Sequence, residues 1–242
     1  MGKFEVKKVN LYEVLADKLE EMIINDSSMF GQKLPSENEL AKQFGVSRNI
    51  IREALKLLRE RGLIVSRIGD GSYVSKPEPQ ILTNVISRML VMYDIDANDV
   101  YEMRVMLECQ ACFLAAKRVT EKDLEILTQI NRAMEKKQDD LEERVNLDLK
   151  FHEKIAELSG NSLLRIFVCS MNHLRKVVIK QAIQSEGGSQ DGIDYHDRII
   201  AALRSRDANL AEQVMRAHLK ESLRRHQWFE AIKKNQNTPA IR

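Results

Sequence analysis

Helix-breaking residues are distributed very unevenly along this chain. Proline occurs at positions 35, 77 and 79 and not again until 239, and the only glycines beyond position 71 are at 160, 187, 188 and 192. Because both residues interrupt regular backbone structure, their scarcity predicts a C-terminal domain made almost entirely of helices. Apolar periodicity places these helices near 80–92, 97–118, 120–138, 141–158, 161–184, 192–204 and 207–233.

Long helices joined by short turns pack as an antiparallel bundle. The segment 186–192 is predicted to be the one flexible connection within it. The two prolines at 77 and 79 cannot continue a strand or a helix, so we place the domain boundary there. The expected domains are residues 1–78, a helical domain at 79–235, and a tail at 236–242.

The N-terminal domain shows the pattern of a helix-turn-helix. Ser36 and Glu39 form a capping box, Gly45 supplies a left-handed residue that ends the first helix, and Ser47 caps the second. Residues 63–67 and 72–74 can then pair as a hairpin around a glycine-rich turn. An amphipathic helix beginning at Leu11 would support this winged helix-turn-helix.

Positive charge is concentrated in the same region. Residues 42–67 hold seven Lys or Arg and two acidic residues, whereas the whole chain has a net charge of only +2. Arg48 and Arg52 lie one turn apart on the outer face of the second helix, and Lys56 follows one turn later. A cationic helix of this kind is built to enter the major groove of DNA, although a solvated basic surface helix is the simpler alternative.

The sequence from about Leu11 to Ser75 resembles the winged helix of the GntR family of bacterial transcription regulators. The likeness is carried by LPSENELAKQFGVSR, by REAL and GLI further on, and by the glycine-flanked wing. It implies contacts to bases or phosphates from the following residues: Ser47, Arg48, Asn49, Arg52, and the wing at Gly69 and Gly71. We expect Lys56 to contact phosphate.

Two positions depart from the family pattern. The family usually has Arg where this chain has Asn38, and commonly Thr where it has Asn49. Both positions belong to the expected DNA-binding surface, so the operator sequence of this protein cannot be inferred from the operators of its relatives. A homodimer on a palindromic operator is expected, because one recognition helix reads too few base pairs.

Four polar residues fall on apolar helix faces in the C-terminal domain. Asp148 and His152 are four residues apart on one stripe, and His196 and His218 lie on the apolar stripes of two other helices. One carboxylate and three imidazoles form a ligand set suited to a divalent metal, with zinc favoured over nickel or manganese. The alternative is three separate core histidines, each bonded to a backbone carbonyl. His173 and His226 show no such partnering and are interpreted as surface or interface residues.

These spacings also resemble the metal ligands of the FCD ligand-binding domain of FadR-type GntR regulators. The stretches 101–108 and 115–118 resemble that domain's first long helix. The resemblance implies that a metal sits in the cavity of a small carboxylate effector, such as a sugar acid, hydroxy acid or dicarboxylate. Arg104 would contact this effector; a salt bridge to Glu108 is the alternative.

The function expected from these features is effector-controlled regulation of transcription rather than catalysis. The competing hypothesis is a metal-dependent hydrolase fused to a nucleic-acid-binding module, but no general base, nucleophile motif or phosphate-binding loop accompanies the four residues. Cys109 and Cys112 lie mid-helix and are expected to be small core residues. No apolar run is long enough to span a membrane. The three cysteines show no pattern of paired disulfides, which suits a reducing compartment, so a cytoplasmic protein is expected.

Overall fold

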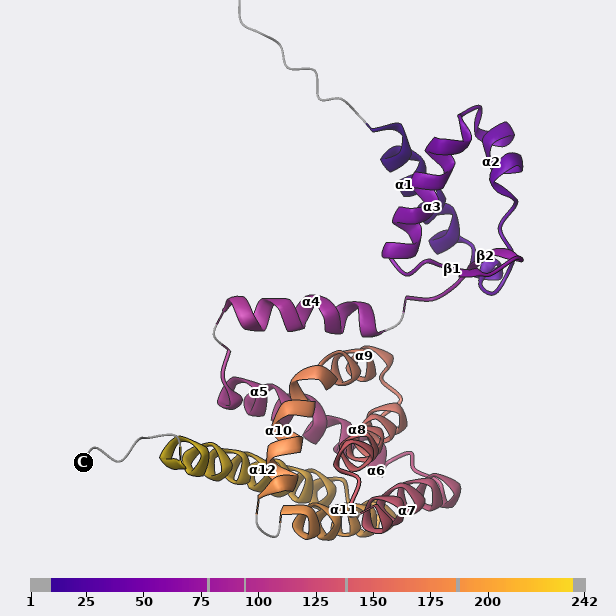
Figure 1. The fold of residues 1–242 in the computed structure, drawn as a ribbon. Helices are drawn as coiled ribbons and strands as arrows, with labels where there is room; N and C mark the ends of the chain where they lie inside the picture. The colour runs from indigo at the N-terminus through magenta and orange to yellow at the C-terminus, as the bar shows by residue number, and fades with distance from the viewer. Residues whose placement is uncertain (1–9, 78, 94, 138, 186–187, 237–242) are drawn as a thin grey trace, which may run out of the picture. The chain divides into compact units, whose positions relative to one another are not determined.

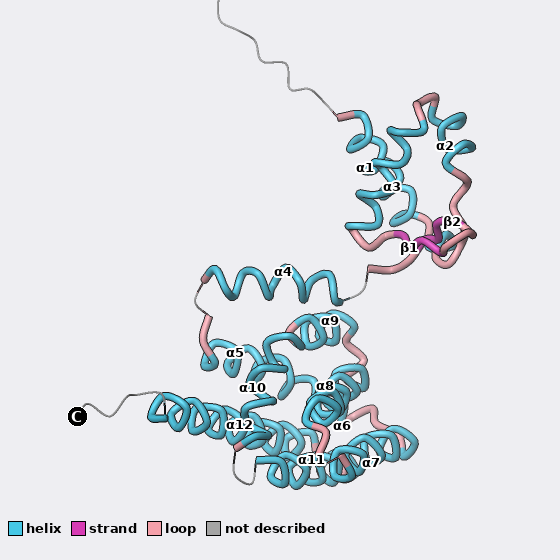
Figure 2. Tube along the Cα trace, in the orientation of Figure 1, coloured by secondary structure: helices cyan, strands magenta, loops and turns pink. Residues whose placement is uncertain are grey.

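The protein is presented as a computed structural model (Figure 1), which describes residues 10–77, 79–93, 95–137, 139–185 and 188–236. The chain divides into two compact units, Met1–Ile81 and Leu82–Arg242. Both are built mainly of helices, and the only described sheet is a two-stranded hairpin in the first unit (Figure 2), which confirms the predicted fold class. The domain boundary at residues 78–79 remains a prediction, because the division falls just inside a helix that begins at Pro79.

The N-terminal unit contains the predicted helix-turn-helix and wing. Its elements are α1 (Leu11–Asn25), the 3-10 helix η1 (Ser27–Met29), α2 (Glu37–Phe44), α3 (Arg48–Glu60), β1 (Ile64–Arg67) and β2 (Gly71–Val74). The antiparallel strands place Ile64 opposite Val74. Fully buried Ile23, Ile51 and Leu58 pack in one core that joins α1, α3 and the hairpin.

Local sequence signals explain how these helices begin and end. The capping box between Ser36 and Glu39 is present, with Glu39 Oε2 accepting from the Ser36 amide at 2.7 Å. Gly45 has φ 66°, the left-handed conformation that lets α2 stop and the chain turn. Ser47 Oγ then accepts from the Ile50 amide at 3.5 Å at the start of α3.

The C-terminal unit is all helical in its described residues. Helix α4 (Pro79–Met92) spans the division between the units, and the elements after it are α5 (Ala97–Arg104), η2 (Val105–Cys109), α6 (Gln110–Ala116), α7 (Glu121–Lys136), α8 (Leu141–Leu158), α9 (Ser162–Ser170), α10 (Asn172–Gln184), α11 (Gly188–Arg204) and α12 (Ala208–Gln236). Helix α8 contacts α6, α7, α9 and α10 (Figure 1). Because it is packed on several sides, polar residues on α8 are buried as well as apolar ones.

The helix predicted at 97–118 is not a regular α-helix. Residues Val105–Cys109 form a π-helical turn between α5 and α6, and the backbone stays right-handed helical on both sides of it. Such a turn inserts one extra residue into a helix and is often found at functional sites. No proline or glycine marks it, so hydrophobic periodicity could not reveal it.

Two other helix boundaries were predicted wrongly. The single helix expected at 161–184 is broken at Met171 into α9 and α10. There the Ser170 hydroxyl donates to the Phe167 carbonyl at 2.9 Å, a local bond that competes with regular helical pairing. Helix α11 begins at Gly188, so residues 188–192 are helical rather than part of a flexible connection, and residues 186–187 lie outside the described chain.

Candidate functional site

The four polar residues singled out from the sequence come together in the C-terminal unit. Asp148 and His152 lie on α8, His196 on α11 and His218 on α12. Each offers one potential ligand atom, and these four atoms all lie within 4.8 Å of one another. All four side chains are buried. The packing of three helices therefore creates a compact set of three imidazoles and one carboxylate.

The separations within this cluster suit a shared metal ion. His152 Nε2 lies 3.2 Å from His218 Nε2, and Asp148 Oδ1 lies 3.5 Å from His196 Nε2. Ligand atoms placed about 2.1 Å from a tetrahedral metal are about 3.4 Å apart. Among the described residues, His196 Nε2 and Asp148 Oδ2 are buried without a hydrogen-bond partner. Leaving such atoms unpaired is costly, so the donor set fits a divalent cation.

Burial keeps these imidazoles in the form that binds metal. It lowers the pKa of His152 to about 3 and holds the pKa values of His196 and His218 well below their usual range. Neutral imidazole is the metal-binding form. Burial also raises the pKa of the Asp148 carboxyl to about 6, because a lone carboxylate is poorly solvated there.

Asn131 on α7 orients His196. Its amide nitrogen donates to the Ile193 carbonyl at 3.0 Å and to Asp197 Oδ1 at 2.8 Å, so its oxygen must face the other way. That oxygen lies 3.2 Å from His196 Nδ1 and can only accept, so the Nδ1–H of His196 donates this hydrogen bond. The Nε2 atom of His196 is consequently unprotonated and faces the cluster, as metal ligation requires.

Glu108 in the π-helical turn has the corresponding place beside His152. Its Oε2 atom lies 2.5 Å from His152 Nδ1, and its Oε1 atom lies 2.7 Å from Arg104 Nε and 3.4 Å from Arg175 Nε. Burial disfavours the ionised carboxylate, but the charges of Arg104 and Arg175 outweigh burial and hold the pKa of Glu108 well below its usual range. One buried anion is therefore shared by two guanidinium groups and an imidazole.

Arg104, the residue expected to contact an effector, does form the salt bridge to Glu108 that was the alternative. Only its Nε is used in that contact. Among the described residues, Nη2 of Arg104 and Nη2 of Arg175 are buried without a hydrogen-bond partner. Both guanidinium groups thus keep a donor for another acceptor.

A cavity of about 30 Å³ lies beside the cluster. Its walls include Arg104, Asp148 and His218 together with Tyr195, Glu221 and Arg225. This volume holds about one water molecule, so a larger ligand would have to move side chains. A ligand in this cavity would reach both the cluster and Arg104.

Arg175 was missed in the sequence, although a signal for it was present. It lies on the same face of α10 as Val178, Ile179 and Ala182, all buried, and its own side chain is fully buried. A charged residue on an apolar stripe is the pattern that identified the histidines. Asn131 was missed in the same way on α7.

The remaining polar candidates lie outside the cluster. His226 on α12 is partly buried, and its lowered pKa follows from that burial. The side chain of His173 lies outside what the structure describes. Cys109 and Cys112 are buried, and burial raises the pKa of the Cys109 thiol to about 11. As expected, both are small residues of the hydrophobic core.

The predicted DNA-binding residues all lie at the surface of the N-terminal unit. Arg48, Arg52 and Lys56 are exposed on α3 and have no ion pair within the described chain. In contrast, Arg61 forms ion pairs with Asp17 and Glu20, so its role is structural. The other exposed members of the set are Asn38 on α2, Ser47 and Asn49 at the start of α3, and Gly69 and Gly71 in the wing.

An exposed cationic recognition helix with a wing, joined to a helical domain with a buried polar cluster, defines a two-domain transcription regulator. Comparison with known proteins identifies its family. The model for bacterial regulatory proteins of the gntR family matches residues 11–74, and that for the FCD domain matches residues 99–221. The chain belongs to the GntR family and carries an FCD domain, and it is a ligand-responsive transcription regulator.

Individual relatives agree with this assignment. The chain is 32% identical to the HTH-type transcriptional regulator LutR of Bacillus subtilis over 82% of this chain and 93% of LutR. It is 28% identical to the HTH-type transcriptional repressor NanR of Cronobacter sakazakii, covering 90% of this chain and 86% of NanR. A solved GntR structure from Streptococcus agalactiae superposes with a TM-score of 0.66 at 26% identity, covering 88% of this chain and 99% of that one. None of the described helices is long and apolar enough to cross a membrane.

Proposed function

We propose that this protein is a metal-dependent transcription regulator that binds operator DNA as a homodimer and responds to a small carboxylate. The observation that carries the proposal is the buried set of Asp148, His152, His196 and His218, whose ligand atoms lie within 4.8 Å of one another. We assign these residues as ligands of a divalent metal, with zinc favoured and nickel or manganese as alternatives. When bound, the metal supplies a Lewis-acidic point for ligand oxygens.

The effector is proposed to be a sugar acid, hydroxy acid or dicarboxylate bound in the cavity beside the cluster. Asp148, His218 and Arg104 line that cavity together. Arg104 Nη2 is a buried donor without a partner in the described chain, and a carboxylate oxygen is its natural acceptor. Arg175 adds a second buried positive charge against the single shared charge of Glu108. A small anion would balance this excess.

The DNA-binding role is assigned to the exposed cations of α3. Arg48 and Arg52 are proposed to contact base edges and Lys56 a phosphate, with Asn38, Ser47, Asn49 and the wing nearby. A homodimer is proposed because palindromic operators match two-fold symmetric proteins. It is supported by an apolar surface formed by Val85, Met89 and Met92 of α4 and by Tyr93 just after this helix, whose side chains are 46–79% exposed.

Regulation is proposed to be repression relieved by the effector. NanR, a relative of similar length, is named as a repressor. Coupling requires the effector to prefer the form with low operator affinity, typically by about 1–3 kcal/mol. The rearrangement would be transmitted through the segment around Pro77 that joins the two units.

The test combines metal analysis, carboxylic acids and DNA. Purified protein should contain one divalent metal per chain by mass spectrometry, and one acid from a panel should raise the melting temperature of the metal-loaded form. That acid should release operator DNA and be recovered unchanged. Turnover of the acid would instead support the hydrolase, and a metal-free protein with full effector response would contradict the metal role.

A further inference from the structure

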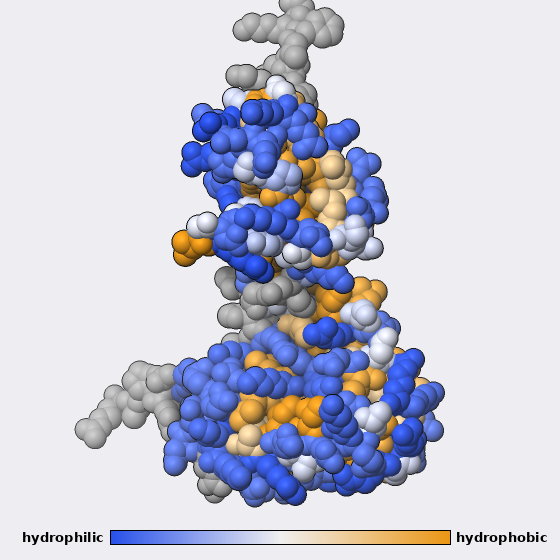
Figure 3. All heavy atoms as spheres, turned by 90° about the vertical axis from the view of Figure 1, so that its right-hand side faces the viewer, coloured by the Kyte–Doolittle hydropathy of each residue, from blue (hydrophilic) through white to orange (hydrophobic). Residues whose placement is uncertain are grey.

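The cavity beside the buried cluster has an inner and an outer side. Arg104 and His218, which line it near the cluster, are 3% and 5% exposed. Asp191 and Glu221 line it as well, and their side chains are 40% and 21% exposed. Hydrophobic residues gather on the face of the C-terminal unit seen in Figure 3, but apolar surface by itself selects no particular acid. The charged residues of the outer side, in contrast, can discriminate between ligands.

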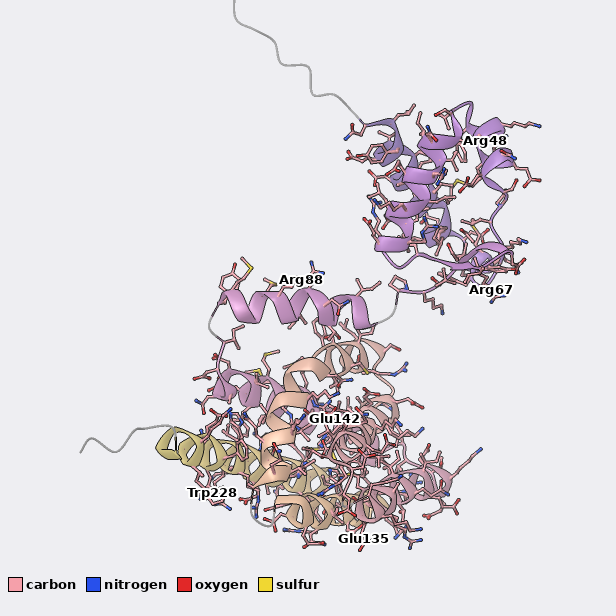
Figure 4. All side chains as sticks on the ribbon, in the orientation of Figure 1. Arg48, Arg67, Arg88, Glu135, Glu142 and Trp228 are labelled. Atoms are coloured by element: carbon pink, nitrogen blue, oxygen red, sulfur yellow. The ribbon has the colours of Figure 1, made fainter. Side chains whose placement is uncertain are left out.

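Arg225 holds the outer side together. Its Nη2 pairs with Asp191, its Nε lies 3.0 Å from Glu221 Oε1, and its Nη1 donates to Ser185 Oγ at 3.4 Å. These contacts tie α12 to the first turn of α11 and to the residue that follows α10. Figure 4 labels Trp228, which lies one turn beyond Arg225 on α12 and marks this part of the helix. The outer side is thus a network of ion pairs that joins three segments of the chain.

The charges of this network are balanced. Glu221 also pairs with Arg224, whose Nη2 lies 2.5 Å from its Oε1 and whose Nε lies 2.8 Å from its Oε2. The two carboxylates of Asp191 and Glu221 therefore face the two guanidinium groups of Arg224 and Arg225. A further carboxylate on the outer side would have to be desolvated without a surplus positive charge to compensate it. It would also compete with Asp191 and Glu221 for Arg225.

The inner side has an excess of positive charge. Arg104 and Arg175 share the single charge of Glu108, with their Nε atoms 2.7 Å and 3.4 Å from its Oε1. Asp148 is assigned to a divalent cation in the proposed metal centre, so its charge neutralises neither guanidinium. A carboxylate is stabilised where it meets an unbalanced cation. The cavity hence has one place for a carboxylate, and that place is on its inner side.

Uncharged groups complete the cavity. Tyr195 and Ser222 supply hydroxyls, and a Cβ added at Gly192 would meet no atom of another part of the chain within 4 Å, so there is open space at this position. Three apolar residues of α10 form another part of the wall: Ile179, Ala182 and Ile183. A carbon chain can pack on these residues while its hydroxyl groups bond to the polar ones. A hydroxyl both donates and accepts and has no net charge, so it suits a wall of balanced ion pairs.

We infer that this cavity selects an effector with one carboxylate and with hydroxyl groups at its other end, and that Asp191 and Glu221 are the residues that make it reject dicarboxylates. The inference rests on the proposed effector site and narrows the class of acid bound there. The single carboxylate meets Arg104 and the metal on the inner side. The distal hydroxyls donate to carboxylate oxygens of the outer side, where a second carboxylate would find both guanidinium groups already paired with acids.

The experiment compares pairs of acids that differ at one terminal group. The pairs are glycerate and tartronate, threonate and tartrate, and gluconate and glucarate. In each pair a terminal hydroxymethyl group of the first acid is replaced by a carboxylate in the second. Binding to full-length, metal-loaded protein is measured by calorimetry. For the chain length that binds most tightly, the monocarboxylate should bind about tenfold more tightly than its dicarboxylate, or better.

Two variants test the residues that carry this preference. Asp191→Asn and Glu221→Gln each remove one negative charge from the outer side and leave it with a net positive charge, so the dicarboxylate should bind about tenfold more tightly than to wild type. A gain of affinity cannot arise from damage to the fold. Asp194→Asn is the matched control, because Asp194 is exposed on α11 and does not line the cavity. It should keep the wild-type preference.

The outcomes separate this inference from the proposed effector site. A wild-type protein that binds the dicarboxylate as tightly as the monocarboxylate would overturn the inference, as would an unchanged preference in both Asp191→Asn and Glu221→Gln. Binding that survives in Arg104→Ala would place the acid elsewhere and contradict the proposed site itself. If none of these acids binds, the proposed site fails and the inference fails with it.

Discussion

His152 Nδ1 lies 2.5 Å from Glu108 Oε2, so the imidazole of His152, whose Nε2 faces the buried cluster, contacts a carboxylate of another helix on its opposite side. Glu108 belongs to the π-helical turn, and its other oxygen contacts Arg104. This relationship ties the proposed metal centre to the proposed effector-binding arginine through a single residue. A substitution at the metal centre is therefore expected to affect effector binding, and a substitution at Arg104 to affect metal binding.

Glu108→Gln should lower metal affinity about 10- to 100-fold, the usual effect of removing a residue that orients a ligand. The amide keeps the size of the side chain but loses the charge that favours a proton on Nδ1. Affinity is measured by competition with a chelator. Glu212→Gln, at a partly exposed carboxylate paired with Arg216, is the control and should bind metal normally. Unchanged affinity in Glu108→Gln would exclude this orienting role.

His196→Ala and His218→Ala should lose metal and the response to effector while keeping basal operator binding, because the cluster lies in the C-terminal unit and the DNA-binding residues in the other. The measurement is metal content beside operator affinity, with and without the acid. His226→Ala removes a partly buried histidine of the same helix as His218 and should retain both properties. A full effector response in a metal-free double variant would leave the four residues as core polar groups.

The metal-free protein should lose stability as pH falls below about 6.5. Burial lowers the folded-state pKa of His152 to about 3 and those of His196 and His218 well below the usual range, so the unfolded chain takes up protons that the folded one does not. Each histidine then costs about 1.4 kcal/mol of unfolding free energy per pH unit below about 6.5.

Asp148 acts in the opposite direction. Burial raises the pKa of this carboxyl in the folded protein to about 6, so it takes up a proton at a higher pH than in the unfolded chain. The folded state therefore gains stability relative to the unfolded state as pH falls toward about 4. The three imidazoles together lower the free energy of unfolding by more than the one carboxyl raises it, so the metal-free protein is destabilised as pH falls. Denaturant unfolding in chelator at pH 7 and pH 5.5 tests this, and H196Q/H218Q should show the weaker dependence. A flat profile in the wild type would contradict it.

Arg48→Ala and Arg52→Ala should each weaken operator binding by about 1–3 kcal/mol and relax specificity at the bases contacted. Both side chains are exposed, so the fold should tolerate their loss. Operator affinity is measured by fluorescence anisotropy. Arg132→Ala, at an exposed position on α7, is the matched control. If both α3 variants bind as wild type, another element is the recognition helix.

Lys56→Ala should weaken binding to all sequences alike and reduce the salt slope by about one. A phosphate contact carries charge but no sequence information, so affinities for operator and random duplex should fall together. Titrations at several salt concentrations give the slope. A selective loss for the operator would show instead that Lys56 reads bases.

Much of the architecture follows from local signals. The capping box at Ser36, the left-handed Gly45 and the cap at Ser47 define the turn between α2 and α3, because each depends only on neighbours along the chain. The inward positions of Asp148 and His152 follow from helical periodicity in the same way. The sequence by itself therefore determined the winged helix-turn-helix, the helical second domain and the four members of the cluster.

Tertiary structure alone decided which residues meet across helices. Nothing in the local pattern places Glu108 behind His152, turns the Asn131 amide toward His196, or brings Arg175 to Glu108. The π-helical turn and the break at Met171 were likewise invisible, since no glycine or proline marks them. Periodicity specifies the face of a helix on which a side chain lies. The partner it meets depends on how whole helices pack, and that is set by contacts between residues far apart in the chain.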